Sequence, residues 1–391
     1  MNQAIILKPT REQSVKRFHP WIFSGGIAKI IGSPKDGDVV EVLDSKQNFL
    51  AIGHYFGGSI SVKILSFEQT EINEQFWFSK IENAYQLRKR LISEDTNCYR
   101  LIHGEADGLP GLIADVYNGV IVLQAHSIGM FNALEMISTA IQRIFGTELK
   151  AIYNKSKETL PSEFAKEIQN SYLFGECAVP HLVKENTFSF LIDWETGQKT
   201  GFFLDQRQNR KLLQDYSKDK KILNAFCYSG GFSVYALGAG AKEVWSVDVS
   251  KKAIELTDKN IEENFNQIVH HQSHSQDVMA FMKQNDDEFD VIILDPPAFA
   301  KNISAKHNAI QGYKRLNMEG IKRLKSKGIL FTFSCSQVID QILFYNTIVS
   351  AAIESGRKVR VLHQLTQAPD HPINLFHPEG NYLKGLVLEV E

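Results

Sequence analysis

The stretch KILNAFCYSGGFSVYALGAGAKEVWSVD, residues 221–248, decides the fold class of the second half of this chain. An apolar run, KILNAF, leads into a turn of small residues. A helical segment is expected from Phe232, and a second apolar run, EVWSVD, ends at Asp248. A strand, a helix and a second strand at this spacing are typical of a parallel βαβ unit.

The same alternation continues toward the C-terminus. Further strands are expected at FDVIILD (289–295) and GILFTFS (328–334), with helices from Lys251 and near residues 313–325. Alternating strands and helices build a doubly wound parallel sheet. We therefore expect an α/β fold from about Thr187 onward.

The N-terminal part has a different pattern. Its first 68 residues carry short β-type runs, DVVEVLD, FLAIGHY and ISVKILSF, with no helix-period segment between them. Such runs predict a small β-barrel. A helix at 76–92, the turn-rich GEADGLPG and two strands around Asn118-Gly119 follow, which favours a mixed α+β middle domain.

A chain of 391 residues is too long for a single hydrophobic core. The change of pattern along the sequence predicts three domains, with linkers near residues 69–75 and 175–187. The domains are expected at residues 1–68, 69–186 and 187–391.

Composition excludes several classes of protein. No run of 18 apolar residues and no signal peptide is present, so we expect a cytoplasmic protein that does not associate with a membrane. The four cysteines are far apart and form no CxxC pair, which indicates neither a metal site nor disulfides. The net charge of −2 is not that of a dedicated nucleic-acid binder, so any RNA contact must come from local clusters.

Three strand ends suggest a cofactor. Ligands of a doubly wound sheet bind outside the carboxyl ends of the strands. The first strand is followed by the small-residue turn 227–231, where backbone N–H groups can approach a ligand. Asp248 ends the next strand and can accept both hydroxyls of a ribose, and Asp277 beside Val278 can accept the amine of an adenine. The dinucleotide fingerprint GxGxxG is missing, so S-adenosylmethionine fits better than NAD.

Two further strand ends suggest the reaction. Asp295 precedes two prolines that hold a stiff, extended corner able to grip a flat base, and Cys335 follows the neighbouring strand. Carbon 5 of a pyrimidine becomes nucleophilic when a thiolate adds to C6. Asp295 could stabilise the charge that develops on a cytosine during this addition. The two residues together indicate methylation of a pyrimidine at C5.

The sequence resembles the PUA-domain 23S rRNA cytosine-C5 methyltransferases over essentially its whole length. The resemblance rests on HPWIFSGGI, GEADGLPGL, KTGFFLDQRQNR, NAFCYSGGFSV, SVDVSKKAI, FDVIILDPPAF, FTFSCS and DHPINLFHPEGNYLKG, which occur in that order. It implies an N-terminal PUA barrel that binds RNA, a middle domain, and a class I methyltransferase domain with S-adenosylmethionine as donor and Cys335 as nucleophile.

The resemblance also implies roles for individual residues. Asp205, Gln206 and Arg207 would lie over the methionine part of the donor. The first turn would be lined by Tyr228, Ser229 and Gly230, with Asp248 on the ribose and Asp277 near the adenine. The corner DPPAF lacks the second cysteine that helps product release in another RNA cytosine-C5 family, so the base that removes the C5 proton is unassigned.

Two alternatives remain open at this point. The corner DPPAF also suits transfer to the exocyclic amine of adenine or guanine, in which case Cys335 would belong to the core. The chain could instead be a non-catalytic RNA-binding factor on a methyltransferase fold. A homodimer is also left open.

Local features offer two hypotheses about RNA. Basic residues gather in LRKRL (87–91) and in YKRLNMEGIKRLKSK (313–327), either of which could contact RNA or form a solvated face. His19, Trp21 and Phe23 alternate as in a strand, and we expect them in the barrel core and rim.

Overall fold

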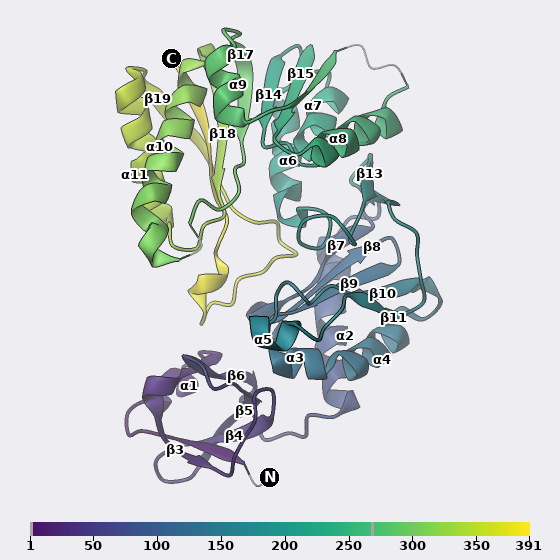
Figure 1. Ribbon diagram of the computed structural model, residues 1–391, viewed down its shortest axis with the longest axis vertical. Helices are drawn as coiled ribbons and strands as arrows, with labels where there is room; N and C mark the ends of the chain where they lie inside the picture. The colour runs from purple at the N-terminus through teal and green to yellow at the C-terminus, as the bar shows by residue number, and fades with distance from the viewer. Residues whose placement is uncertain (1–2, 267–269, 301) are drawn as a thin grey trace. The chain divides into compact units, whose positions relative to one another are not determined.

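The computed structural model describes residues 3–266, 270–300 and 302–391 (Figure 1). The chain forms two compact units. Unit 1 comprises residues 1–186, 192–202 and 369–380, and unit 2 comprises residues 187–191, 203–368 and 381–391. The division into three domains stays a prediction.

Unit 1 begins with the predicted small β domain. Six strands form one sheet in the order β2-β6-β5-β4-β1-β3 and curl into a ring in Figure 1. Its core is aliphatic, with Ile5, Val40, Val42 and Val62 fully buried. The bounds are β1 Ala4–Leu7, β2 Trp21–Phe23, β3 Ile27–Ile31, β4 Val39–Leu43, β5 Phe49–Tyr55 and β6 Ile60–Ser66.

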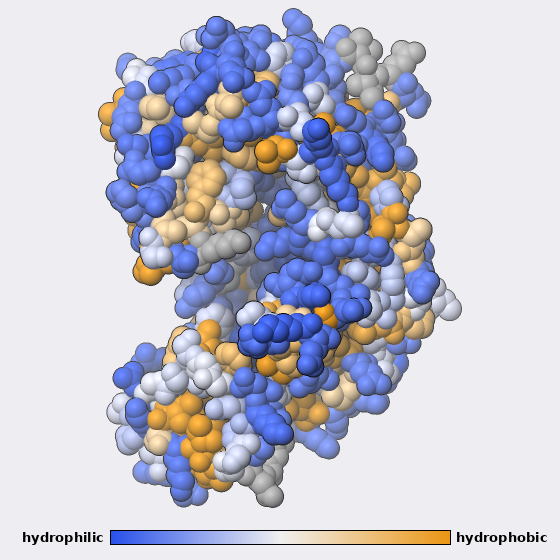
Figure 2. All heavy atoms as spheres, viewed as in Figure 1, coloured by the Kyte–Doolittle hydropathy of each residue, from blue (hydrophilic) through white to orange (hydrophobic). Residues whose placement is uncertain are grey.

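The three runs expected as strands form β4, β5 and β6 with no helix between them, and a short helix, α1 (Glu12–Lys16), lies earlier, between β1 and β2, with Val15 as its buried side chain. The expectation for β2 is wrong in part, because Ile22 fills the core while Phe23 is 49% exposed. Apolar side chains outside the core occur elsewhere on this domain, since Figure 2 shows hydrophobic residues gathered over the region of β3 and β4.

The rest of unit 1 is a mixed sheet with packed helices. Five strands lie in the order β11-β10-β9-β8-β7, and α2 and α4 pack together beside them. Asn118 and Gly119 both have positive φ, which is the backbone of a type I′ hairpin turn, so the predicted hairpin is confirmed. The bounds are α2 Glu74–Leu91, β7 Cys98–His103, β8 Leu112–Tyr117, β9 Val120–Ala125, α3 Ile128–Asn132, α4 Leu134–Phe145, β10 Ala151–Asn154, α5 Ser162–Ala165 and β11 Ser171–Phe174.

The predicted linker at 175–187 is wrong in part, because strand β12 (His181–Glu185) occupies five of its residues. Its side chains alternate, with Val183 and Glu185 buried. Strand β13 (Phe188–Ile192) follows directly.

Unit 2 is the predicted doubly wound domain. Seven strands lie in the order β16-β15-β14-β17-β18-β20-β19, and neighbouring strands from β16 to β18 are parallel. The bounds are β14 Lys221–Ala225, β15 Glu243–Asp248, β16 His271–Ser275, β17 Phe289–Leu294, β18 Leu324–Ser334, β19 Val359–Leu365 and β20 Lys384–Val390.

Helices cover both faces of this sheet (Figure 1). Alternate strand residues face opposite cores: Leu223 and Ile292 pack with side chains of α9, α10 and α11, whereas Ile222 and Val291 pack with α6 and α7. The bounds are α6 Arg207–Leu213, α7 Gly231–Gly238, α8 Lys251–Asn264, α9 Val278–Gln284, α10 Lys306–Lys322 and α11 Gln341–Ser355.

The structure corrects two expectations for unit 2. The sheet is not all parallel, because β20 runs antiparallel to both β18 and β19. The helix expected near 313–325 spans Lys306–Lys322 instead, and Leu324 already pairs with Phe289 as the first residue of β18. Across the described ranges, no helix is long and apolar enough to cross a membrane.

Candidate active site

The candidate site lies at the carboxyl ends of β14, β15, β17 and β18 in unit 2. The turn after β14 is tightly wound, since Phe226, Tyr228 and Gly230 all have positive φ. The backbone N–H of Tyr228 donates to Asp248 Oδ2 at 3.1 Å, and that of Ser250 donates to Asp248 Oδ1 at 2.9 Å. These two hydrogen bonds let the Asp248 carboxylate brace the turn. Asp248 is only partly buried, so part of this residue still faces solvent.

Helix α8 fixes the other side of the same turn. Thr257 Oγ1 donates to the Tyr228 carbonyl at 2.9 Å, and Asn260 Nδ2 donates to the Ser229 carbonyl at 2.8 Å. A Cβ on Gly230 would lie 2.6 Å from Thr257 Cγ2, so glycine is required by both φ and space. Ser229 and Gly230 therefore shape the turn through the backbone.

Asp277 and Val278 stand at the end of β16, the next strand of the sheet. Asp277 is exposed, and its Oδ1 accepts a hydrogen bond from the N–H of Ala280 at 2.8 Å, which makes it the N-cap of α9. Val278 is buried in the adjacent core. One carboxylate oxygen of Asp277 is left for a ligand at this edge.

The segment Asp205–Arg207 is connected to this edge of the sheet by side-chain hydrogen bonds. Gln206 Nε2 donates to Asp295 Oδ2 at 3.0 Å, and Gln206 Oε1 accepts from Asn209 Nδ2 at 2.6 Å. Asp205 Oδ2 accepts from the Tyr382 hydroxyl at 2.7 Å. Asp205 Oδ1 is buried and has no hydrogen-bond partner among the residues that the structure describes. Arg207 is buried at the start of α6.

Asp295 occupies the corner after β17. Burial, and next the negative charge of Asp205, raise the pKa of this carboxyl to about 7, although the hydrogen bond from Gln206 and the charge of Arg210 act in the opposite direction. Near neutral pH, Asp295 therefore exists in both protonation states and can donate as well as accept a hydrogen bond.

Cys335 lies beside Asp295, as the sequence predicts. Strands β17 and β18 are parallel neighbours in which Leu294 pairs with Thr332, so the residues after both strands meet at one edge. Burial first, and then the charges of Asp295 and Asp205, raise the pKa of the Cys335 thiol to about 11. Cys335 is nevertheless partly exposed, unlike the buried Cys98 and Cys227.

The sequence alone assigns no role to two further residues near this thiol, Tyr382 and Lys384. Tyr382 donates to Asp205, and Lys384 Nζ donates to the carbonyl oxygens of Ser336 at 2.8 Å and Tyr382 at 2.6 Å. Both belong to NYLKG, a stretch that contributes to the family resemblance. The pairing of Lys384 with Ser334 across β18 and β20 places this lysine beside Cys335, and only the fold reveals that.

Ion pairs occupy one residue of the first basic cluster and most of the second. Arg88 of LRKRL is fully buried and forms an ion pair with Asp107, so this member of the cluster cannot contact RNA. Four of the six basic residues of 313–327 lie in ion pairs: Lys314 with Glu354, Lys322 with Glu319, Arg323 with Asp286 and Lys325 with Asp290. The solvated-face interpretation therefore fits this helix best.

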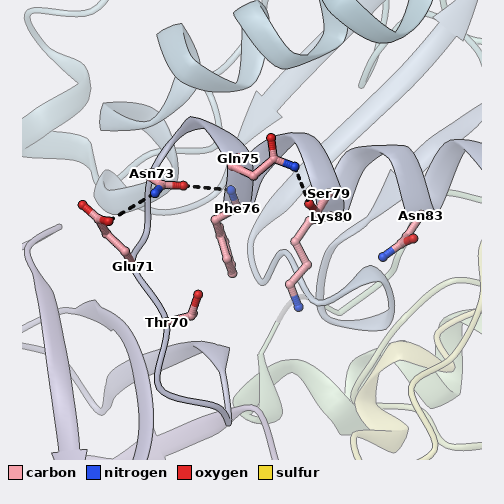
Figure 3. A pocket seen from close by; sticks show the side chains of 8 residues that line it. All are labelled: Thr70, Glu71, Asn73, Gln75, Phe76, Ser79, Lys80 and Asn83. Atoms are coloured by element: carbon pink, nitrogen blue, oxygen red, sulfur yellow. Dashed lines mark hydrogen bonds between the residues drawn. The ribbon is translucent and has the colours of Figure 1, made fainter.

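A cavity of about 380 Å³ lies elsewhere, at the start of α2 in unit 1 (Figure 3). The hydrogen bonds drawn there are local ones, such as Asn73 Oδ1 accepting from the Phe76 N–H at 3.1 Å, which caps the helix. We assign it no reaction. In the described part of the chain, no group of three or more His, Cys, Asp or Glu residues could hold a metal ion.

Comparisons with known proteins show which families this chain is similar to. A family model described as S-adenosylmethionine-dependent methyltransferase matches residues 99–373, and one described as PUA-like domain matches residues 5–67. Proteins named ribosomal RNA large subunit methyltransferase I are similar along the whole chain. The one from Alteromonas mediterranea is 39% identical, covering 100% of this chain and 99% of its own. The one from Tolumonas auensis is 38% identical, covering 99% of each.

The chain belongs to this family of S-adenosylmethionine-dependent methyltransferases. A solved structure, a putative methyltransferase from Streptococcus mutans, has a TM-score of 0.84 at 23% identity and covers 99% of each chain, which confirms the fold. The predicted family, fold class, enzyme class and methyl donor are thereby confirmed. The assignment of individual site residues stays a prediction.

The residues at the strand ends fit the donor of this family. S-adenosylmethionine carries an amino group, two ribose hydroxyls and an adenine amine. The buried Oδ1 of Asp205 accepts no hydrogen bond from the residues that the structure describes, and buried acceptors are ordinarily satisfied. Asp248 and Asp277 present further carboxylate oxygens at the same edge of the sheet.

Proposed function

We propose that this methyltransferase forms 5-methylcytosine in 23S rRNA, with Cys335 as the nucleophile. The names of its relatives support the large-subunit ribosomal RNA as substrate. The observation that carries the choice of C5 is the pair of strand ends: a partly exposed thiol stands beside the Asp295 carboxyl at the edge where the donor is expected. Direct transfer to an exocyclic amine would need no thiol there.

Donor binding is proposed for the residues around the first turn. Asp205, Gln206 and Arg207 would hold the methionine part, with Tyr228, Ser229 and Gly230 lining the turn. Asp248 would bind the ribose, and Asp277 with Val278 the adenine. When bound, S-adenosylmethionine supplies an electrophilic methyl group.

The thiol would act in two stages. As a thiolate, Cys335 Sγ would form a bond to C6 of the cytosine, and the electron pair of the C5–C6 double bond becomes available at C5, which takes the methyl group as the bond between that methyl group and the donor sulfur breaks. The proton then leaves C5 to a base that is not yet assigned. The electrons of the broken C5–H bond restore the C5–C6 double bond, and the C6–S bond breaks to release the Cys335 thiolate. The enzyme is thereby regenerated.

Asp295 would assist the first stage. A protonated carboxyl can donate a hydrogen bond to N3 of the cytosine, where negative charge develops during thiolate addition. The raised pKa of Asp295, about 7, suits this task. Its neutral form would also remove the largest charge that opposes ionisation of Cys335.

Residues 1–68 are proposed to bind RNA and to contribute no chemistry. The PUA-like match covers residues 5–67, and this domain lies apart in sequence from the strand-end residues. We further propose that the enzyme acts in the cytoplasm, where ribosomal RNA is made in bacteria. A homodimer stays a prediction that light scattering on the purified protein would test.

The experiment that tests the function is modification mapping. Ribosomal RNA from cells without this protein should lack a methyl group on a cytosine of the large-subunit RNA, as read by mass spectrometry of nuclease fragments. Wild-type protein should restore the methyl group, and Cys335→Ser should not. Identical modification in the presence and absence of the protein would contradict the proposal.

A further inference from the structure

Lys384 is a buried cation beside the Cys335 corner, by which we mean residues 334–336 at the end of β18. It is 6% exposed, and as the first residue of β20 it pairs with Ser334 across the antiparallel ladder. Its ammonium group donates to the carbonyl of Ser336 at 2.8 Å. Lys384 therefore contacts the residue before Cys335 through the ladder and the residue after it through the side chain.

This cation has no ionic partner of its own. Its ammonium is held by two backbone carbonyls, those of Ser336 and Tyr382, and forms no ion pair within the part of the chain that the structure describes. A buried charge is costly unless an opposite charge accompanies it. Burial lowers the pKa of Lys384 to about 8, while the charge of Cys335 acts to raise it. A thiolate at Cys335 would supply the missing anion.

Other charged groups face the same corner. Asp295 after β17 and Asp205 before α6 both raise the pKa of the Cys335 thiol, and Lys384 lowers it. Tyr313 of α10 also interacts with the thiol, and Asp340 at the start of α11 interacts with Lys384. When Asp295 is protonated, or is hydrogen-bonded to the target cytosine, its negative charge would raise the pKa of the Cys335 thiol less. The positive charge of Lys384 would then lower that pKa against less opposition.

We infer that Lys384 is a positioning residue that holds the Cys335 corner and stabilises the Cys335 thiolate as its counter-ion. This inference rests on the proposed role of Cys335. The stabilising form of Lys384 is the ammonium, and no bond of this residue forms or breaks when the thiol proton leaves to solvent or to a base.

The test is the pH dependence of thiol alkylation in the full-length protein without RNA. Iodoacetamide labelling of Cys335 is followed by peptide mass spectrometry, with the partly exposed Cys177 as internal reference. Lys384→Gln keeps an amide donor for the carbonyls but removes the charge. It should slow labelling of Cys335 at pH 8 about tenfold, the effect of one pKa unit, and leave Cys177 unchanged. Lys384→Arg should restore most of the rate.

Lys358→Gln serves as the matched control, since Lys358 is exposed next to the far end of the same sheet. Equal labelling of Cys335 in wild type and Lys384→Gln would overturn the inference.

A second measurement tests the inference if Lys384→Gln does not fold. Coupling between two sites is reciprocal, so a permanent negative charge at position 335, in Cys335→Asp, should raise the pKa of Lys384 relative to Cys335→Asn, read from the pH dependence of its acetylation in competitive labelling. An unchanged acetylation profile would overturn the inference. Neither readout needs methylation, so a failure here is distinct from a failure of Cys335 to form an adduct with RNA.

Discussion

The side-chain amide of Gln206 donates a hydrogen bond of 3.0 Å to Asp295 Oδ2. This bond favours the ionised carboxylate and so opposes the two effects that raise the pKa of Asp295, burial and the charge of Asp205. Gln206 thus moderates the protonation of the carboxyl group that is proposed to face the cytosine.

Removing that amide should shift the pH dependence of methylation. In Gln206→Leu the pKa of Asp295 rises above its wild-type value of about 7, so the alkaline limb of the single-turnover rate should move to higher pH. Gln208→Leu, at an exposed position in the first turn of α6, is the matched control. Superimposable pH profiles for the two variants would rule out this role of Gln206.

Asp295 should also leave a signature in stability. Its folded-state pKa is raised from 3.8 to about 7, so the unfolded chain releases this proton at lower pH than the folded chain does. The folded state therefore loses stability as pH rises from about 4 to about 7. The stability gained in Asp295→Asn should grow between pH 5.5 and pH 7 and level off above it, as measured by calorimetry. A gain that does not depend on pH would contradict the raised pKa.

Asp248→Ala should weaken donor binding. The carboxylate braces two backbone N–H groups of the site and is proposed to accept the ribose hydroxyls. Affinity for S-adenosylhomocysteine should fall at least about tenfold, or roughly 1.4 kcal/mol, in titration calorimetry. Asp286→Ala, at a fully exposed surface position, should bind normally. Unchanged affinity in Asp248→Ala would remove this residue from the site.

Two glycines with similar φ angles allow the steric effect of an added Cβ to be distinguished from the effect of backbone conformation. Gly230 and Gly240 have φ of 76° and 83°, but only at Gly230 would a Cβ meet another atom, Thr257 Cγ2 at 2.6 Å. Gly240→Ala should cost about 1 kcal/mol in urea unfolding and keep donor affinity. Gly230→Ala should cost more and also weaken donor binding, because the turn must shift. Equal effects on both measurements would mean that the contact with Thr257 is unimportant.

Much of the site could be predicted because its residues follow strands that the sequence marks clearly. The runs that end at Asp248, Asp295 and Cys335 are apolar and bounded by turn residues, and parallel strands bring their carboxyl ends to one edge. The side chains proposed for the reaction are therefore local neighbours of strong strand signals.

The remaining features depend on contacts distant in sequence. Lys384 lies opposite Ser334, the residue before Cys335, only because β20 returns antiparallel between β18 and β19, and nothing in KGLVLEV alone indicates that pairing. Arg88 has the sequence context of an exposed basic cluster, but Asp107 draws it into a buried ion pair. Leu324 continues a helical pattern, yet its pairing with Phe289 makes it the start of a strand.

Trapping the enzyme on RNA tests the central claim most directly. An RNA substrate that carries 5-fluorocytosine at the target position should stop the reaction after methyl transfer, because fluorine cannot leave C5 as a cation. The protein should then migrate with RNA in a denaturing gel, only when S-adenosylmethionine is present, and Cys335→Ala should abolish the shifted band while Cys177→Ala retains it. A Cys335→Ala enzyme that methylates ordinary RNA at close to the wild-type rate and forms no less adduct would contradict the account.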